Sequence, residues 1–416
     1  MSRRPPVILL GLDTAVGLVA MRELGRHGVP VIGVGYHAQA LGRGSRYLSG
    51  FLVRPEGPLS SWLPQLVARH HAGAVLPLRD RDIVDVAALG AEIGGAWNLG
   101  APAGPAALVM DKARTLEAAS ACGIVVPRSW QPEDAREPIP DLTWPVVLKW
   151  ADPLPVMASL AAAGLPDLKV EYCSDEKSLR RALERYRPIS RYPMVQEYVR
   201  GRGLGQTLYM DGGKATLRFQ HERVHEWPPS GGVSSLCRAV PLARHAGQMR
   251  LSEALLAAIG WEGYAMVEYR FDEASGRSTL MEVNGHLWGS LALSSACGAE
   301  FAWEAYRRRV LGETSLARPP RTNLSARDLV KETRRLVRLF GSVRSDDPCF
   351  DPTPWRDLSR YILGFFDPRT RSYVFSWRDP VPAFWGLGST LARAAARLRP
   401  RGSGAPPMGE APEPVS

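Results

Sequence analysis

The sequence lacks several features that would each assign it to a familiar class of protein. It has no run of 18 or more apolar residues, so we expect no membrane-spanning helix. Its five cysteines are scattered and form no Cys-x-x-Cys pair, which indicates neither a zinc site nor a disulfide framework. The apolar run Val7–Leu10 is too short for the core of a signal peptide. We therefore expect a cytoplasmic protein with reduced cysteines.

The positive charge of the chain is not concentrated in any one segment. The net charge is +10, and most of the excess is arginine spread along the sequence. No basic run with interleaved aromatic residues is present, so we expect no direct binding to nucleic acid. Anionic small molecules and membrane surfaces remain as partners for such a charge.

The chain does have the length, 416 residues, for two to three domains. Over its first ~105 residues, strand and helix signals alternate. Val7–Leu10 is a buried-strand pattern, Ala15–His27 has helical spacing, and Val29–Val34 is a second strand pattern. Such a βαβ order predicts a parallel sheet with right-handed crossovers. We predict a Rossmann-like α/β domain over residues 1–106.

The turn after the first predicted strand contains glycines but no dinucleotide fingerprint. Gly11 and Gly17 lie in Gly-Leu-Asp-Thr-Ala-Val-Gly, whereas the fingerprint requires G-x-G-x-x-G. One interpretation is a phosphate or substrate contact at the helix N-terminus. We favour the other, a tight turn with Asp13 or Thr14 capping the helix. The missing fingerprint also argues against a nicotinamide-dependent oxidoreductase.

After the first domain, helices combine with antiparallel hairpins, which is an α+β pattern. We predict a helix from Ala106 to Cys122 and strands at Val146–Trp150 and Met194–Val199. The turn signal Asp211-Gly212-Gly213 and the loop at residues 272–277 each predict a hairpin between two strands.

From residue 315 to 400 the pattern weakens into a C-terminal extension. Residues 325–340 can form a basic amphipathic helix, whereas residues 345–385 are rich in Pro, Asp and Trp and are predicted to be loops. The last segment, residues 401–416, is rich in Pro, Gly and Glu and is predicted to be disordered.

A short basic helix is predicted between these segments, with Leu387, Leu391 and Leu398 on one side and Arg399 at its end. Together with Phe384 and Trp385, this C-terminal basic helix could touch a membrane surface or an acidic partner. We favour the alternative that it packs on the protein's own core.

The strongest chemical signal is a pair of acidic strands. Glu282 and Asn284 are two residues apart on a predicted strand, so their side chains point to the same face. The preceding strand carries Glu268 and is separated from them by a single turn, so the two carboxylates can lie side by side. Carboxylate and amide oxygens suit magnesium, and adjacent carboxylates repel unless a cation lies between them. The alternative is a solvated hairpin face.

Two lysines and an arginine add positive charge at defined places. Lys149 ends an apolar strand and must meet an anion or extend to solvent, and Lys112 lies near the start of a helix. Arg223 lies in a charged strand that leads into Ser230-Gly231-Gly232, and it could hold phosphoryl or carboxylate oxygens. The alternatives are surface lysines and an exposed loop.

The strand Met194–Val199 runs into a glycine-rich bend. Backbone groups at such a bend could hydrogen-bond the edge of an adenine, and an ordinary strand end is the alternative.

The order of these motifs resembles that of the ATP-grasp superfamily, specifically its carboxylate–amine ligase-like and carbamoyl-phosphate-synthase-like members. The resemblance covers about residues 5–312. It rests on Asp111-Lys112, Pro145–Lys149, Gln196-Glu197-Tyr198-Val199, Val267-Glu268-Tyr269-Arg270 and Met281–Asn284.

The resemblance implies a fold, a ligand set and a reaction. A pre-ATP-grasp domain would precede a two-lobed ATP-grasp domain at residues 107–314, whose lid would span about residues 125–195. The γ-phosphate of ATP would pass to a small-molecule carboxylate, and an amine or similar nucleophile would attack the acyl phosphate. The implied residues are Lys112 and Lys149 on the ATP phosphates, Gln196, Glu197, Tyr198 and Val199 as the adenine hinge, and Glu268, Glu282 and Asn284 on Mg²⁺ or Mn²⁺.

The sequence departs from the family pattern after the metal-binding strand. Where the family commonly has Asn-Pro-Arg, this chain has Asn284-Gly285-His286. The positive charge that faces the reacting phosphate would therefore come from His286, Arg223 or Arg270. A non-catalytic nucleotide-binding or scaffold protein is therefore the rival hypothesis. The sequence leaves open whether the chain forms a homo-oligomer.

Overall fold

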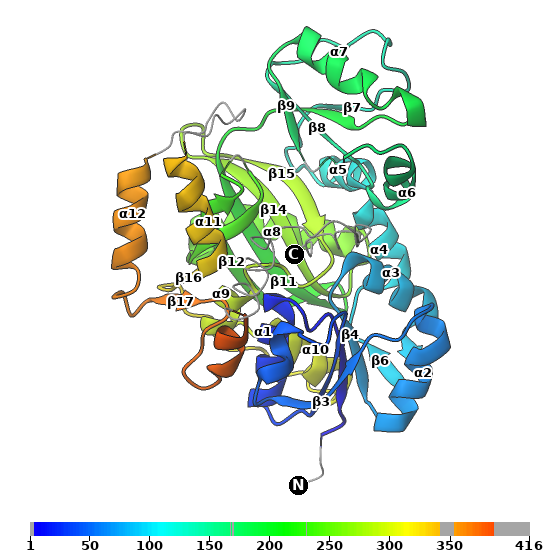
Figure 1. Ribbon diagram of the computed structural model, residues 1–416, viewed down its shortest axis with the longest axis vertical. Coiled ribbons are helices and arrows are strands. Elements are labelled where there is room, and N and C mark those ends of the chain that lie inside the picture. Colours follow the sequence, from blue (N-terminus) through cyan, green and yellow to red (C-terminus); the bar gives the residue numbers. More distant parts are fainter. Residues whose placement is uncertain (1–3, 167, 169, 230, 342–352, 387–416) are drawn as a thin grey trace, which may run out of the picture. The chain divides into compact units, whose positions relative to one another are not determined.

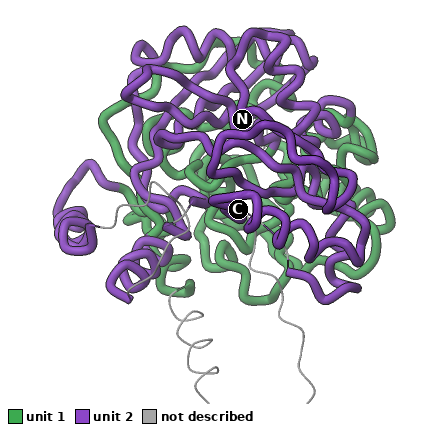
Figure 2. The backbone as a smooth tube through the Cα atoms, turned by 90° about the horizontal axis from the view of Figure 1, so that it is seen from above, with its two compact units in different colours: residues 1–103, 286–328, 371–416 green, residues 104–285, 329–370 purple. Residues whose placement is uncertain are grey.

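The computed structural model describes residues 4–166, 168, 170–229, 231–341 and 353–386. The chain forms two compact units (Figure 2). The first unit comprises residues 1–103, 286–328 and 371–416, and the second comprises residues 104–285 and 329–370. Each unit is therefore assembled from segments that are far apart in the sequence.

The first unit contains a six-stranded sheet with the order β3-β2-β1-β4-β6-β5 (Figure 1). All neighbouring pairs are parallel except β5 and β6, so the predicted parallel sheet is confirmed. Its strands are β1 (Val7–Leu10), β2 (Val31–Gly35), β3 (Leu48–Val53), β4 (Ala74–Pro77), β5 (Glu92–Ile93) and β6 (Ala96–Asn98). Its helices are α1 (Ala15–Arg26), η1 (Leu41–Gly44), α2 (Leu59–His70), α3 (Asp80–Leu89), α9 (Leu291–Ala296) and α10 (Phe301–Arg309).

The turn between β1 and α1 is a capped tight turn, as we favoured. Thr14 Oγ1 accepts a hydrogen bond from Gly17 N at 3.0 Å. A Cβ atom on Gly17 would lie 2.5 Å from Gly11 O, so only glycine allows the helix to start this close to the strand. Asp13 does not cap the helix, because its Oδ2 accepts a hydrogen bond from Tyr36 N instead.

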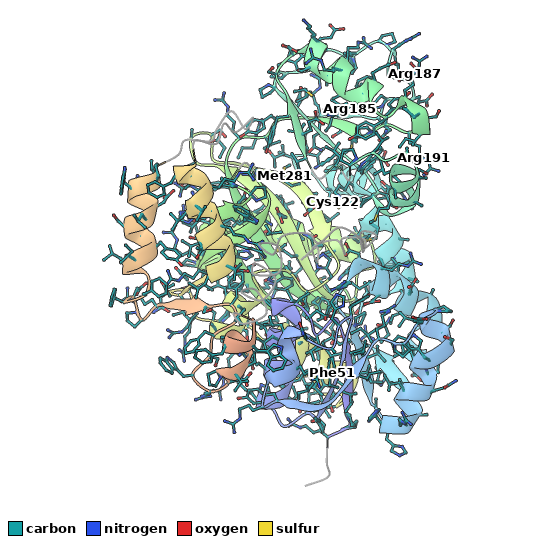
Figure 3. The ribbon with its side chains drawn as sticks, viewed as in Figure 1. Phe51, Cys122, Arg185, Arg187, Arg191 and Met281 are labelled. Carbon is teal, nitrogen blue, oxygen red and sulfur yellow. The ribbon has the colours of Figure 1, made fainter. Side chains whose placement is uncertain are left out.

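The second unit contains a small antiparallel lobe in the region for which a lid was predicted. Its strands have the order β7-β10-β8-β9, and α7 starts with a capping box between Asp175 and Ser178. Arg185, Arg187 and Arg191 all lie on this lobe (Figure 3). The strand predicted to reach Val199 ends at Glu197. The elements are β7 (Ser129–Trp130), β8 (Val146–Lys149), α6 (Leu154–Ala162), β9 (Glu171–Cys173), α7 (Glu176–Glu184), η2 (Arg187–Ile189) and β10 (Met194–Glu197).

The rest of the second unit is organised around antiparallel strands in the order β15-β14-β11-β12-β13. Both predicted hairpins are confirmed, because β11 pairs with β12 and β14 pairs with β15. The strands are β11 (Arg202–Asp211), β12 (Lys214–Trp227), β13 (Val233–Ala239), β14 (Gly263–Asp272) and β15 (Arg277–Asn284). The helices are α4 (Ala103–Met110), α5 (Lys112–Ala121), η3 (Leu242–His245) and α8 (Ala246–Ala258). The predicted fold class, an α/β domain followed by an α+β domain, is thus confirmed.

One helix predicted from Ala106 to Cys122 is in fact two, α4 and α5. Asp111 has extended backbone angles, and its side chain accepts hydrogen bonds from Ala113 N and Arg114 N. A capping aspartate satisfies the free amides of a new helix, so the chain turns and starts again at this point.

Two further expectations were wrong in the C-terminal region. The helix predicted over residues 325–340 begins at Leu329 as α11 (Leu329–Phe340), because Ser325–Arg327 form strand β16. The region predicted as loops contains α12 (Pro354–Leu363), which lies beside α11, and strand β17 (Thr370–Ser372).

Three other predictions concern residues outside the described ranges. They are the reduced state of Cys349, the basic helix carrying Leu387, Leu391 and Leu398, and the disordered tail at residues 401–416. In the part of the chain that is described, no helix is both long enough and apolar enough to cross a bilayer.

Candidate functional site

The two acidic strands meet as predicted. In the β14–β15 ladder Glu268 lies directly opposite Glu282, and Met266 lies opposite Asn284. Residues opposite each other on antiparallel strands project from the same face, so the two carboxylates are neighbours. Asn284 Nδ2 also donates a hydrogen bond to Glu282 Oε1 at 3.2 Å. The three predicted metal ligands are therefore brought together.

Arg223 joins this group from two strands away. It lies on β12, yet its Nη2 donates a hydrogen bond to Glu268 Oε2 on β14. The intervening strand β11 carries Gly203 and Gly205, and a Cβ atom at these positions would lie 2.7 Å from Arg223 Cδ and 2.4 Å from His221 Cε1. Glycine at alternate positions of β11 thus leaves the room in which Arg223 crosses the sheet.

Glu226 connects the two arginines of the site and was missed by the sequence analysis. Its Oε2 lies 3.3 Å from Arg270 Nη2, and its Oε1 lies 3.5 Å from Arg223 Nη1. Oε1 is buried and accepts no hydrogen bond from the residues that the structure describes. The alternating glycines at 201, 203 and 205 were the available signal, because they mark a strand face over which neighbouring side chains must lie.

Lys112 and Lys149 bring positive charge to Glu282. Lys112 is the first residue of α5, and its N–H donates to Ala151 O at 3.2 Å, just beyond the end of β8 where Lys149 lies. Burial is the largest influence on Glu282 and acts to raise its pKa. Lys112 and Lys149, with smaller contributions from Asn284 and Arg223, together outweigh burial and hold the pKa below its ordinary value. Burial lowers the pKa of Lys149 to about 8, against the opposing charge of Glu282.

Glu268 behaves differently from Glu282. Burial raises the pKa of Glu268 to about 7, Glu282 adds to the increase, and Arg223 opposes it. Two carboxylates side by side, of which Glu268 is buried and Glu282 half-buried, form a site that a divalent cation would complete. The hard oxygen donors fit Mg²⁺. Among the described side chains, no group of three or more His, Cys, Asp and Glu residues is arranged to hold a metal, so the predicted trio depends on the amide of Asn284.

At the predicted adenine hinge, most polar groups already have partners. Gln196 is buried and bonds Ser129 Oγ, and Glu197 Oε1 accepts from Thr143 N. The N–H groups of Glu197 and Tyr198 donate to Arg128 O and Pro145 O. Val199 N–H has no such partner within the described ranges.

Val199 N–H is therefore the hinge amide that remains available to a ligand. The side chains of Gln196 and Glu197 instead hold the lobe together.

His286 belongs to the first unit, although it follows Asn284 by two residues. Its Nε2 lies 3.5 Å from Asp80 Oδ1, and its Nδ1 lies 2.9 Å from Leu287 O. Within its own unit, the imidazole thus has Asp80 as an acidic neighbour.

No protein-family profile matches the chain, and no curated protein matches it in sequence. Solved structures do match it in fold. The L-amino acid ligase of Bacillus licheniformis is 15% identical, with a TM-score of 0.56 over 74% of this chain and 75% of that one. The biotin carboxylase domain dimer of the 2-oxoglutarate carboxylase of Hydrogenobacter thermophilus, in complex with MgADP, ADP and bicarbonate, is 15% identical, with a TM-score of 0.58 over 77% and 73% of the two chains.

Pyruvate carboxylase of Rhizobium etli, with the activator acetyl coenzyme A, is similar as well. It is 14% identical, with a TM-score of 0.58 over 77% of this chain. The match spans only 29% of that much longer chain. At such identities the similarity is one of fold.

Proposed function

The chain has the ATP-grasp fold, and on that premise we propose that it is an ATP- and magnesium-dependent carboxylate–amine ligase. A carboxylate oxygen of the substrate attacks the γ-phosphorus of ATP, the bond from that phosphorus to the ADP oxygen breaks, and ADP leaves. The lone pair of an amine then attacks the acyl carbon, the C–N bond forms, and phosphate leaves with the electrons of the C–O bond. The amine proton passes to solvent. Catalysis of this kind depends on positioning and on neutralising charge.

The observation that carries the proposal is that Glu268 and Glu282 face each other across the hairpin. The positive charges of Lys112 and Lys149 act on the carboxylate of Glu282. A structural hairpin would gain nothing from two like charges side by side, whereas a site for a metal–polyphosphate complex needs charges of both signs. The lysines supply contacts to phosphate oxygens. Glu268, Glu282 and Asn284 would hold Mg²⁺, which neutralises phosphate charge when bound.

The arginines have a second role in the proposal. Arg223 and Arg270 are held by Glu226, so their guanidinium groups are fixed in direction before a substrate arrives. Preorganised cations stabilise the charge that develops on a transferred phosphoryl group. The neighbours support the ligand set, since one is an L-amino acid ligase and another was solved with MgADP and bicarbonate.

The test measures ADP and phosphate release from Mg–ATP over pools of carboxylates and amines. We expect release that depends on both substrates and falls about 1000-fold in Glu282→Gln, which removes a charge on the metal side of the site. The matched control is Glu273→Gln, because Glu273 lies in the β14–β15 loop with 52% of its side chain exposed. Equal rates in wild type and Glu282→Gln would contradict the assignment of the site.

A nucleotide-binding protein without turnover is the second candidate, and His286 is the observation that favours it. Stabilisation of the wild type by Mg–ATP, with no ADP release from any pool, would support this candidate. His286→Arg restores a fixed positive charge after Asn284. Release of ADP by this variant alone would show that the fold is competent and that His286 silences it.

A further inference from the structure

Helix α12 has its apolar side turned to solvent. Trp355, Leu363 and Phe366 are 73%, 65% and 81% exposed. With Ile362, which is also exposed, they occupy positions i, i+7, i+8 and i+11, which is one stripe along a helix and its continuation. An ordinary surface helix would bury such a stripe.

The opposite side of α12 is polar and packs on the second unit. Asp357 is 4% exposed, and its Oδ2 accepts a hydrogen bond from Arg335 Nη2 on α11 at 3.0 Å. Tyr361 OH lies 2.8 Å from Thr333 Oγ1, also on α11. On this side the helix is thus attached through polar contacts, and most of the apolar stripe stays exposed.

Helix α11 extends the exposed apolar area. Val337 and Phe340 are exposed on it, and the ring of Phe340 contacts that of Trp355 edge-on at 5.1 Å. We call the combined area the α11–α12 apolar face, which consists of Val337, Phe340, Trp355, Ile362, Leu363 and Phe366. Contiguous exposed apolar side chains of this kind mark interaction surfaces in soluble proteins.

On the two helices, the exposed charged side chains are basic and the acidic side chains are buried. Arg338, Arg356 and Arg360 are exposed, whereas the acidic residues Glu332 and Asp357 are buried. Glu332 accepts a hydrogen bond from Ser235 Oγ and lies 2.9 Å from His225 Nδ1, so its charge is used inside the unit. The exposed charges on α11 and α12 themselves are therefore positive.

We propose that the α11–α12 apolar face docks on an anionic lipid bilayer surface. Trp, Phe, Leu and Ile side chains would enter the boundary between headgroups and acyl chains, while Arg338, Arg356 and Arg360 meet lipid phosphates. The net charge of +10 acts in the same direction. Helices as short as α11 and α12 cannot span a bilayer, so the contact is peripheral.

The test is flotation of the full chain with vesicles of phosphatidylcholine alone or with about 30% phosphatidylglycerol, at about 0.1 M salt. We expect binding to the anionic vesicles only, weakened when salt is raised. The double variant Trp355→Ser/Phe366→Ser should bind at least about tenfold less, because each side chain loses its burial in lipid. The triple variant Arg338→Gln/Arg356→Gln/Arg360→Gln should lose the preference for anionic lipid. Leu316→Ser is the control, since Leu316 is exposed outside this face.

Three results would overturn the proposal. The first is no flotation with anionic vesicles. The second is binding unchanged in the double variant but lost in a chain ending at residue 386, which would assign the contact to the segment beyond. The third is a concentration-dependent dimer in light scattering that the double variant abolishes, which would assign the face to a second copy of the chain. Melting curves of every variant verify that it is folded.

Discussion

Strand β12 carries residues of two ionic clusters that differ in the balance between acidic and basic groups. One contains Arg223 and Glu226 and extends to Glu268 on β14. The other contains His225, whose two ring nitrogens lie 2.9 Å from Glu332 Oε2 and 3.7 Å from Asp357 Oδ1. Irregular pairing with β13 on both sides of His225 allows residues so close in the sequence to serve different clusters.

The difference separates a site from a structural contact. Around Glu332, burial is the largest influence and acts to raise the pKa, but His225, Ser235 and Arg335 together outweigh it and leave the pKa below its ordinary value. Around Glu268 the outcome is opposite, because burial and Glu282 prevail over Arg223. The cluster around Glu332 is complete as it stands, whereas the cluster around Glu268 would gain from a bound cation. Titratable groups whose charged form the fold leaves unfavourable are expected at ligand-binding sites, where a bound ligand compensates for this cost.

Breaking the complete cluster should have the largest effect on stability. Glu332→Gln removes the charge that pairs with His225 and accepts from Ser235, so we expect a loss of about 3 kcal/mol in the free energy of unfolding. ATP affinity should change little in the fraction that remains folded. Urea unfolding and nucleotide titration measure the two quantities, with Glu273→Gln as the exposed control. A variant as stable as wild type would remove the distinction drawn between the clusters.

Lys149→Met tests the site cluster and should weaken ATP binding about 30-fold, the equivalent of about 2 kcal/mol for a hydrogen bond to a charged group. Lys214→Met, in the exposed β11–β12 turn, is the control. Because the pKa of Lys149 is about 8, the free protein loses this charge as pH rises through 8. Binding must then take up a proton, so ATP affinity should fall between about pH 7 and pH 9 in wild type but not in Lys149→Arg. Calorimetric titration at both pH values decides; equal pH dependence in the two proteins would exclude Lys149.

A smaller effect is expected from closing the space above β11. In Gly205→Ala the new Cβ meets the His221 ring at 2.4 Å, and displacement of the buried ring should reduce the free energy of unfolding by about 1.5 kcal/mol. ADP release should fall as well, because Arg223 crosses the same strand. Gly104→Ala is the control, since a Cβ there meets nothing within 4 Å. Normal stability and activity in Gly205→Ala would show that β11 does not need its glycines.

The sequence predicted what depends on neighbours along the chain. The opposition of Glu268 and Glu282 follows from strand alternation and one short loop, and the structure has it. The sequence could not predict that Arg223 reaches across β11, because this depends on which strand lies between β12 and β14. Glu226 was missed for the same reason, since its two arginines come from different hairpins.

The prediction for the C-terminal region was wrong for a different physical reason. Helix α12 was predicted as loop because Pro354, Asp357 and Trp355 are not the residues of a helix that packs by apolar contact. Its apolar stripe becomes visible only when the buried, ion-paired Asp357 shows which side faces the protein. The sequence also could not predict that the chain returns to the first unit. This return depends on a buried ion pair between Arg22 and Asp379, which are 357 residues apart in the sequence.

The smallest predicted effect concerns a backbone group of the site. Val199→Pro removes the hinge amide that has no partner within the described residues, and proline favours an extended conformation at the preceding Tyr198. If this amide binds the adenine edge, ATP affinity should fall about fivefold, as for one neutral hydrogen bond of about 1 kcal/mol. Val199→Ala retains the N–H and should bind as wild type does. Because both variants lose the valine side chain, equal affinity in the two would place the adenine contact elsewhere, whereas a loss confined to the proline variant would assign it to the backbone.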